Sequence, residues 1–291
     1  MIIGTTKEKK KFENRVAISP DEAKSYIKLG HHVQVEKNAG LQSGFSDKLY
    51  KEAGATMSSA KDILKNSDIL VKINCPSPEE ANQLKSSSMV ISQLNTQTDI
   101  DSIKIFNSKK ISAFSLERVP RITRAQDMDI LSSQANLAGY HAVIDAAQEF
   151  NRVLPLFMTA AGKVTPANVL VIGAGVAGLQ AIATAKRLGA IVYATDVRIA
   201  SKEQVESLGG KFVMVEDEES KNAETKGGYA KEMSVEYQKK QEALLAETLK
   251  EMDIVICTAQ IPGRKAPLIL KKETVSYTHL TLPTRDDVEM S

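Results

Sequence analysis

The sequence predicts an α/β protein built from two doubly wound (Rossmann-like) domains joined by a long helix. Three observations lead to this prediction. Short apolar runs alternate with amphipathic stretches over residues 2–116, a pattern typical of a parallel sheet covered by helices. A continuous amphipathic stretch then covers residues 125–150. Beyond it, another apolar run ends in a glycine-rich turn, which a helical pattern follows.

Local signals predict the elements of the first domain. In the stretch Ser19-Pro20-Asp21-Glu22, Ser is an N-cap, Pro stands at the first helical position and Glu at N3, which predicts a helix ending near Gly30. The stretch Ser77-Pro78-Glu79-Glu80 repeats this signal and opens another helix. Apolar runs predict strands at 2–5, 33–36, 69–73, 89–94 and 111–116, and amphipathic stretches predict helices at 46–53, 59–66 and 100–107.

The amphipathic stretch 125–150 predicts the junction between the domains. Its apolar residues recur at helical spacings from Ile130 to Phe150, it has no Pro, and its one glycine, Gly139, is tolerable in a helix. Residues 151–166 are predicted to be a loop. We expect a first α/β domain at 1–134, a nucleotide-binding domain at 135–275, and an atypical tail at 276–291, where no helical or strand period is long enough for a further element.

Composition narrows the class of protein. The 291 residues are 42% apolar and 25% charged, with a net charge of +2, which fits a globular protein and offers no bulk positive charge for nucleic acid. The basic run at 7–11 predicts a solvated loop. No segment has the order of a signal peptide, and the apolar run 169–183 is too short and glycine-rich to cross a bilayer. The histidines and cysteines show no metal-ligand spacing, and we expect Cys75 and Cys257 to be buried thiols.

A dinucleotide-binding motif lies at residues 168–178, which read NVLVIGAGVAG. Its G-x-G-x-x-G follows a predicted strand and opens a predicted helix. The first glycine permits the tight turn, the second lets the backbone approach a pyrophosphate, and the third lets the helix pack closely on the strand. The helix N-terminus offers N–H groups and a positive dipole end to the phosphates. We therefore expect six residues to bind the cofactor: Gly173, Ala174, Gly175, Val176, Ala177 and Gly178.

An acidic residue ends the next apolar run, at 191–195. Asp196 can accept hydrogen bonds from the adenosine ribose hydroxyls and would repel a 2′-phosphate, so the sequence favours NAD(H) over NADP(H). Val197 and Arg198 are expected on the same side of the cofactor. An Arg can also pair with a phosphate, but we expect Arg198 to support the adenosine end.

Four stretches go beyond a generic nucleotide-binding domain, and together they resemble the alpha subunit of the proton-translocating NAD(P) transhydrogenases. This family shares its fold with alanine dehydrogenase. The resemblance implies direct hydride transfer from NADH to NADP+ held on a partner component, coupled to proton movement through a membrane component. It also implies a homodimer and a location on the cytoplasmic face of the plasma membrane through NADP(H)-binding and membrane-spanning partner subunits. The stretches are ENRVAISP, RITRAQDMDILSSQANLAGY, EDEESKNAETKGGYAKEMSVEYQKKQ and TAQIPGRKAP.

The resemblance also implies roles for individual residues. The second stretch resembles the loop at the nicotinamide end of NADH, where the implied catalytic residues are Arg121, Gln126, Asp129 and Ser132. The third stretch resembles a mobile flap over the nucleotide, with Gly227 and Gly228 as hinges and Tyr229 and Met233 as covering residues. The fourth follows a predicted strand at 254–258, and its cofactor contacts are expected at Thr258, Ala259 and Gln260.

Two alternatives remain open. Arg15 and Lys72 match positions that hold the substrate carboxylate in alanine dehydrogenase. That reaction also needs a proton-transfer group, and the sequence has no His between His32 and His141. A non-catalytic NAD-binding protein would need the glycine motif but not the nicotinamide-side residues. The presence of both sets favours the transhydrogenase.

Overall fold

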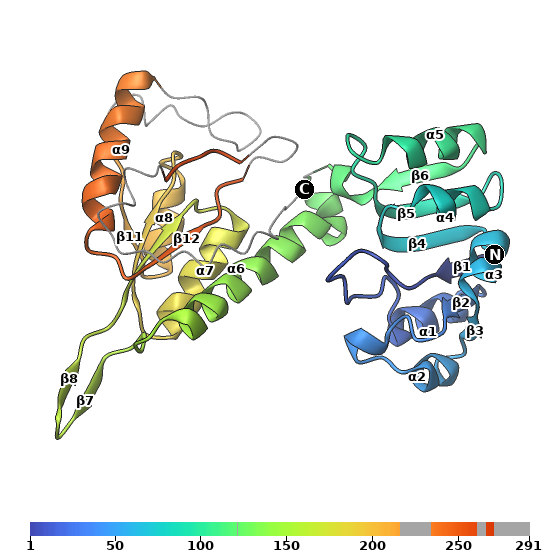
Figure 1. Cartoon of the computed structure of the whole chain (residues 1–291), viewed down its shortest axis with the longest axis horizontal. Helices are drawn as coiled ribbons and strands as arrows, with labels where there is room; N and C mark the ends of the chain where they lie inside the picture. The colour runs from blue at the N-terminus through green and yellow to red at the C-terminus, as the bar shows by residue number, and fades with distance from the viewer. Residues whose placement is uncertain (121, 216–233, 261–265, 271–291) are drawn as a thin grey trace. The chain divides into compact units, whose positions relative to one another are not determined.

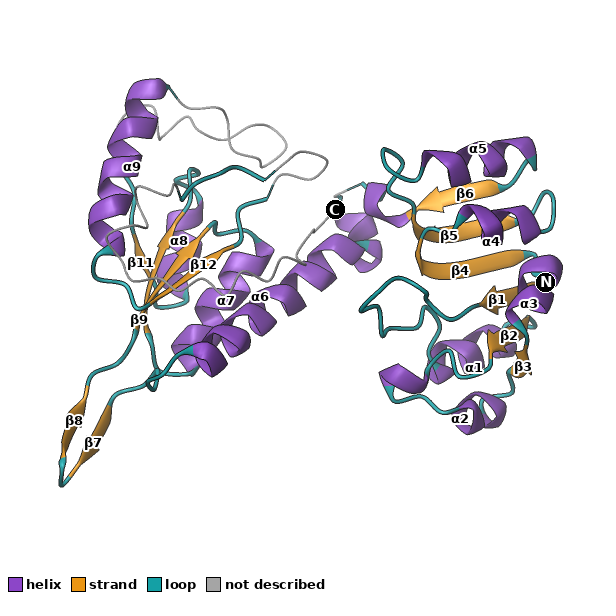
Figure 2. Cartoon of the chain, in the orientation of Figure 1, coloured by secondary structure: helices purple, strands orange, loops and turns teal. Residues whose placement is uncertain are grey.

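The computed structural model describes residues 1–120, 122–215, 234–260 and 266–270. The chain divides into two compact units, Met1–Leu131 and Ser132–Ser291, whose helices and strands are labelled in Figure 1. Each unit is built on a parallel sheet with helices packed against it (Figure 2). The predicted α/β class with two doubly wound domains is confirmed.

The first unit contains a six-stranded parallel sheet in the order β3-β2-β1-β4-β5-β6, the order of a doubly wound fold. One hydrophobic cluster joins α1 and α2 to β1 and β2, and another joins α3, α4 and α5 to β4 and β5. The strands are β1 Ile2–Thr5, β2 His32–Glu36, β3 Thr56–Ser58, β4 Ile69–Asn74, β5 Met89–Gln93 and β6 Ser112–Ser115. The helices are α1 Pro20–Lys28, α2 Asp47–Glu52, α3 Ala60–Asn66, α4 Pro78–Gln83 and α5 Ile100–Ser108, with short 3₁₀ segments at Leu41–Ser43, Leu116–Arg118 and Thr123–Met128.

The helix starts of this unit form as the sequence predicts. Ser19 and Glu22 make a reciprocal capping box at α1, and Ser77 and Glu80 make another at α4. Gly30, just after α1, has a φ of 86°, the left-handed conformation that ends many helices. The expected helix boundaries therefore hold to within one or two residues.

The second unit contains a four-stranded parallel sheet in the order β11-β10-β9-β12. Its central strand β9 is buried along Val169, Leu170, Val171 and Ile172, as expected for a parallel strand covered on both faces. The strands are β9 Asn168–Ile172, β10 Ile191–Thr195, β11 Lys211–Phe212 and β12 Ile254–Cys257, and a separate antiparallel hairpin pairs β7 Phe157–Thr159 with β8 Gly162–Val164. The helices are α6 Ile130–Glu149, α7 Val176–Arg187, α8 Ser201–Ser207 and α9 Val235–Leu249.

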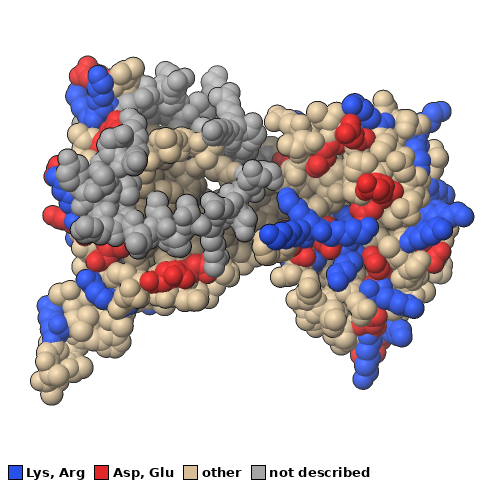
Figure 3. Space-filling view, in the orientation of Figure 1, with Lys and Arg blue, Asp and Glu red and all other residues tan. Residues whose placement is uncertain are grey.

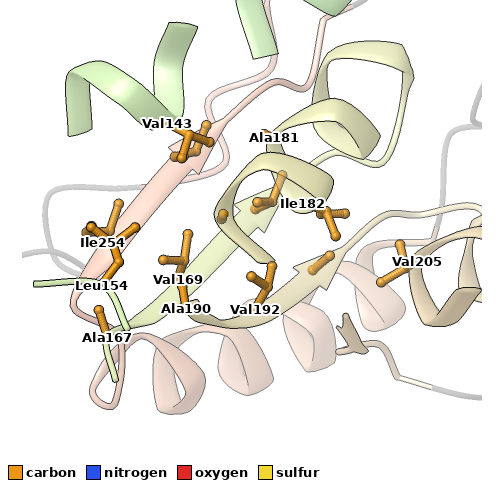
Figure 4. Packing of buried hydrophobic residues seen from close by; sticks show 14 of the residues in the cluster. Val143, Leu154, Ala167, Val169, Ala181, Ile182, Ala190, Val192, Val205 and Ile254 are labelled. Carbon is orange, nitrogen blue, oxygen red and sulfur yellow. The ribbon is translucent and has the colours of Figure 1, made fainter. Parts of the chain in front are cut away.

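The main core of this unit holds α6 and α7 against the sheet. Side chains from three strands, including Val169, Val192 and Ile254, meet Ile182 of α7 and Val143 of α6 (Figure 4). Because β9 leads directly into the glycine motif and α7 out of it, this core fixes the position of the motif.

Three local predictions are wrong. The long helix begins at Ile130 rather than at 125, because the preceding residues form a 3₁₀ segment in which only Ala125 is buried, so no apolar face is available to extend the helix. The expected loop 151–166 contains the β7–β8 hairpin, whose strand residues are all exposed and so show no alternating pattern. The short strand β3 was not predicted, for the same lack of a readable period.

Exposure also tests the predictions for charged residues and thiols. The lysines of the basic run 7–11 are exposed, as predicted, but Glu8 within that run is buried. Basic and acidic side chains are interspersed over the drawn face of the first unit (Figure 3). The prediction of two buried thiols is wrong: Cys75 is half-buried and Cys257 is exposed at the end of β12. Among the described residues, no helix combines the length and hydrophobicity that a bilayer crossing requires.

Candidate nucleotide-binding site

The glycine motif forms the turn between β9 and α7. Gly173 has a φ of 96°, which a residue with a side chain rarely adopts, and its N–H donates to the Thr195 carbonyl at 2.8 Å. A Cβ on Gly178 would lie far inside 3.0 Å of the Gly173 carbonyl oxygen, which real Cβ atoms essentially never do. The first and third glycines are thus required by the turn and by the close packing of α7, as the sequence predicts.

Gly175 has a different environment. It is exposed, its φ is −78°, and no atom of the described residues lies within 4 Å of the position that a Cβ would take. The packing of the protein therefore does not require glycine here. It is the N-cap of α7 with no side-chain cap hydrogen bond, so this helix start presents backbone N–H groups beside open space. A pyrophosphate that approaches the backbone closely is a ligand that would require the absence of a side chain at this position.

The neighbouring residues of the motif divide between packing and exposure. Ala174 is buried and Ala177 is half-buried, whereas Val176 is exposed at the start of α7. A Cβ on Gly139 of α6 would lie 2.8 Å from the carbonyl carbon of Ala177 and closer still to its oxygen. Helix α6 therefore touches the backbone of the motif. Its glycine is a packing requirement rather than merely a tolerated residue.

Asp196, just after β10, contacts both the glycine motif and its own loop. Its Oδ2 accepts from the Ala174 N–H at 2.8 Å. Its Oδ1 and Oδ2 accept from Nε and Nη2 of Arg198 at 2.9 and 3.0 Å. Burial alone would raise the pKa of Asp196, but the hydrogen bonds from Arg198 and Ala174 hold it below its ordinary value of 3.8. Asp196 is therefore a carboxylate at neutral pH, and Val197 beside it is exposed.

A pH dependence follows from this lowered pKa. A carboxyl group with a lowered folded-state pKa stabilises the protein above its ordinary pKa, and this stabilisation is lost as the pH falls through the folded-state pKa. We expect Asp196→Asn to remove this contribution, so that stability falls less steeply below about pH 4 than in the wild type. Urea unfolding at a series of pH values measures the slope. An acid limb as steep as that of the wild type would contradict the expectation.

The loop after β12 packs against the turn of the glycine motif and forms hydrogen bonds with it. The Thr258 hydroxyl donates to the Gly173 carbonyl at 2.8 Å, and its N–H donates to the Ile172 carbonyl at 2.8 Å. Ala259 packs against Gly173, where a Cβ would lie 2.9 Å from the Ala259 nitrogen. Gln260 is exposed. The structure thus brings Thr258 and Ala259 to the predicted site, where they position the turn.

Sequence reasoning missed Gln241 on α9. Its side-chain amide donates to the Thr195 hydroxyl at 3.0 Å and accepts from the Val215 N–H at 2.9 Å. These bonds tie α9 to the end of β10, one residue before Asp196. Nothing local in the sequence marks Gln241, because it is one polar residue among many in a polar helix.

The candidates for the nicotinamide end are only partly described. Gln126 is exposed in the 3₁₀ segment of the first unit, and its carbonyl accepts from the Asp129 N–H at 3.1 Å. Ser132 lies in the first turn of α6, in the second unit. Arg121 lies outside the described residues, as do the flap residues Gly227, Gly228, Tyr229 and Met233.

The two cations that would suit a substrate carboxylate are engaged within the chain. Lys72 is only 3% exposed, and its Nζ lies 3.4 Å from Glu80, 3.8 Å from Glu8 and 3.1 Å from the hydroxyl of Thr6. Arg15 forms an ion pair with Glu13 at 2.6 Å. Lys72 therefore has two carboxylate partners of its own, and it is not available to a carboxylate ligand without loss of these buried partners.

Other reactive groups do not add a second site. Burial raises the pKa of the Cys75 thiol to about 12, so it is not a thiolate at neutral pH. Among the described residues, no group of three acidic, His or Cys side chains is arranged to hold a metal ion.

A turn clamped by Gly173 and Gly178, an open helix start at Gly175 and a carboxylate after the second strand are the features of a dinucleotide-binding domain. Models of the two domains of one family match the chain: "Alanine dehydrogenase/PNT, N-terminal domain" over residues 4–138 and "Alanine dehydrogenase/PNT, C-terminal domain" over residues 142–279. The chain belongs to this alanine dehydrogenase/PNT family, as the sequence resemblance predicts.

Within the family, the transhydrogenases are the more similar relatives. The chain is 50% identical over 282 residues to an NAD(P) transhydrogenase subunit alpha of Rhodospirillum rubrum, covering 95% of this chain and 73% of the relative. The crystal structure of a transhydrogenase from Sinorhizobium meliloti matches with a TM-score of 0.86 at 48% identity, covering 94% of this chain and 74% of that one. Identity to the alanine dehydrogenase of Bacillus subtilis is 27% over 278 residues, covering 94% of this chain and 67% of the relative. The chain is an oxidoreductase of the transhydrogenase type, and its family implies a nicotinamide nucleotide as cofactor.

Proposed function

We propose that this chain is the NAD(H)-binding component of a proton-translocating transhydrogenase. In this role it presents NADH to NADP+ held on a partner component, and the transfer is coupled to proton movement through a membrane-spanning component. The observation that supports NAD(H) binding most directly is the open position at Gly175, between two glycines that the turn itself requires.

The residues fit the cofactor in separate ways. The N–H groups at the start of α7 hold the pyrophosphate beside Gly175. Asp196 accepts from the adenosine ribose, and its negative charge disfavours a 2′-phosphate, which supports NAD(H) rather than NADP(H) as the ligand of this chain. Thr258 keeps the turn in place through the Gly173 carbonyl. The residues around the turn therefore bind and orient one dinucleotide.

The proposed chemistry asks little of the protein beyond orientation. The bound nicotinamide supplies the hydride, so this chain needs no general acid or base for the transfer itself. We assign Arg121, Gln126, Asp129 and Ser132 to holding the nicotinamide end, since amide, guanidinium, carboxylate and hydroxyl groups can fix a carboxamide. We assign Tyr229 and Met233 to covering the nucleotide and keeping water out.

The proposal extends to the assembly. Residues 1–134 form the first α/β domain and residues 135–275 the nucleotide domain of each chain. Two chains form a homodimer. NADP(H)-binding and membrane-spanning subunits hold it at the cytoplasmic face of the plasma membrane.

Alanine dehydrogenase is the alternative that shares this fold. Its reaction requires a cation for the substrate carboxylate and a proton-transfer group. Lys72 and Arg15 are both paired with carboxylates here, and the sequence has no His from residue 33 to residue 140. Together with the higher identity to transhydrogenases, these observations favour the proposed function.

The test combines a transfer assay with the variant Gly175→Ala. The chain mixed with an NADP(H)-binding component should reduce an NAD analogue at the expense of NADPH. Ala at 175 meets none of the described residues, and the poorer N-cap is offset by the lower entropy of the unfolded chain, so its unfolding temperature should stay close to that of the wild type. Its methyl group would meet the pyrophosphate, so the Kd for NADH should rise about tenfold or more, equivalent to about 1.4 kcal/mol.

The outcomes separate the alternatives. If Gly175→Ala binds NADH with the affinity of the wild type, the pyrophosphate does not bind at this turn. Oxidation of NADH that depends on pyruvate and ammonia, without transfer to the NAD analogue, would establish the alanine dehydrogenase instead. Binding of NADH without either reaction would leave a non-catalytic NAD-binding protein.

A further inference from the structure

The carboxylate of Asp196 is fully engaged by groups of the chain itself. Its Oδ1 accepts from the backbone N–H and from Nε of Arg198, each at 2.9 Å. Its Oδ2 accepts from Nη2 of Arg198 at 3.0 Å and from the Ala174 N–H at 2.8 Å. A carboxylate offers about four acceptor positions, and four donors occupy them here. A ribose hydroxyl can bond to Asp196 only if one of these donors leaves.

The guanidinium of Arg198 is the donor that can leave. The Ala174 N–H belongs to the clamped glycine turn, where the preceding Gly173 N–H is bound to Thr195. The Arg198 N–H belongs to the backbone only two residues from Asp196. By contrast, the guanidinium ends a flexible side chain that is 23% exposed, whereas the Asp196 side chain is 8% exposed. Water can therefore replace the carboxylate for Arg198, but the buried carboxylate needs new donors, and two ribose hydroxyls can supply them.

We propose that Arg198 is a specificity-determining residue. Its guanidinium caps the Asp196 carboxylate, by pairing with it, until the adenosine ribose displaces it. The inference rests on the proposed function, because its ligand is the same NAD(H). Separation of the ion pair opposes binding and weakens the affinity for NADH. The displaced guanidinium remains two residues from Asp196, where its charge offsets part of the repulsion between Asp196 and a 2′-phosphate. Arg198 thus trades affinity for NADH against tolerance of NADPH.

Titration of the full chain and of Arg198→Met with NADH and with NADPH tests this cap. Met keeps a long apolar side chain but has no charge. We expect the Kd for NADH to fall about three- to tenfold, the range for loss of a partly exposed ion pair. The Kd for NADPH should rise, because Asp196 then repels the 2′-phosphate without compensation. Arg198→Lys keeps the charge but loses the bidentate fork, so its Kd for each nucleotide should lie between those of the wild type and of Arg198→Met.

The opposite signs distinguish this role from a structural one, since misfolding would weaken both nucleotides together. Arg187→Met is a matched control: Arg187 is exposed in the last turn of α7, and its replacement should change neither Kd. If the wild type binds NADH and Arg198→Met binds it no more tightly, the proposed role of Arg198 is wrong and the proposed function still stands. Failure of the wild type to bind NADH overturns both.

Discussion

Replacement of Lys72 by Met should lower the free energy of unfolding of the first unit by about 3–5 kcal/mol. Lys72 is the buried cation between two buried carboxylates, Glu8 and Glu80, and the Met side chain would fill its space without its charge. The loss would leave both carboxylates in a poorly solvated site, where the backbone N–H groups of Ile73 and Ser77 still donate to them and the exposed Lys9 still pairs with Glu80. Urea unfolding of the variant against the wild type measures the cost.

The cost should come from the uncompensated charge, and two further variants test that cause. Lys48→Met removes an exposed lysine paired with Glu52 at 3.7 Å and should change stability by less than about 1 kcal/mol. Adding Glu80→Gln to Lys72→Met should recover some of the loss, because one of the two buried charges is then gone. If Lys72→Met lowers the free energy of unfolding no more than Lys48→Met does, the ion pairs of Lys72 with Glu8 and Glu80 do not stabilise the fold.

Replacement of Gly139 by Ala should destabilise the second unit by about 1–2 kcal/mol. The helix propensity of Ala would by itself favour the variant by about 1 kcal/mol. The added methyl group would lie 2.8 Å from the carbonyl carbon of Ala177, and overpacking typically costs about 1–3 kcal/mol, more where the neighbour is backbone that cannot rotate away. The packing cost should therefore exceed the propensity gain.

The same variant should also weaken NADH binding, because Ala177 belongs to the glycine motif and α6 would push the start of α7 away from the turn. Thermal unfolding and NADH titration of Gly139→Ala measure the two effects. Gly175→Ala is the matched control for the stability measurement alone, since its methyl group meets none of the described residues. A variant at residue 139 more stable than the wild type would mean that α6 does not pack closely on the motif.

Much of the fold could be predicted because its signals are local. The capping boxes at Ser19 and Ser77 need only four consecutive residues, and the structure forms both. The central strand β9 is buried along its length, so its continuous apolar run is visible in the sequence. The turn at Gly173 and the acid at Asp196 follow from strand ends that such runs mark. The turn and the carboxylate of the candidate nucleotide site could therefore be located before their geometry was known.

Errors arose where no period or cap was available to read. The hairpin β7–β8 is exposed on all of its strand residues, so burial leaves no alternation in its sequence. The start of α6 was placed too early because residues 125–129, of which only Ala125 is buried, carry no apolar period that would mark where the helix begins.

The sequence by itself determined the strand–glycine–helix turn, the carboxylate after the second strand and the family, because backbone conformation and the spacing of residues are properties of short segments. Only the tertiary structure showed that Gly139 packs against the backbone of Ala177 and that Lys72 pairs with Glu8 and Glu80. It also showed that Arg198 pairs with the carboxylate of Asp196. The contacts of Gly139 and Lys72 join residues that are distant in sequence, and even the pair of Arg198 and Asp196 depends on a side-chain conformation that the sequence does not specify. Contact distance and burial, rather than residue type, set their energies.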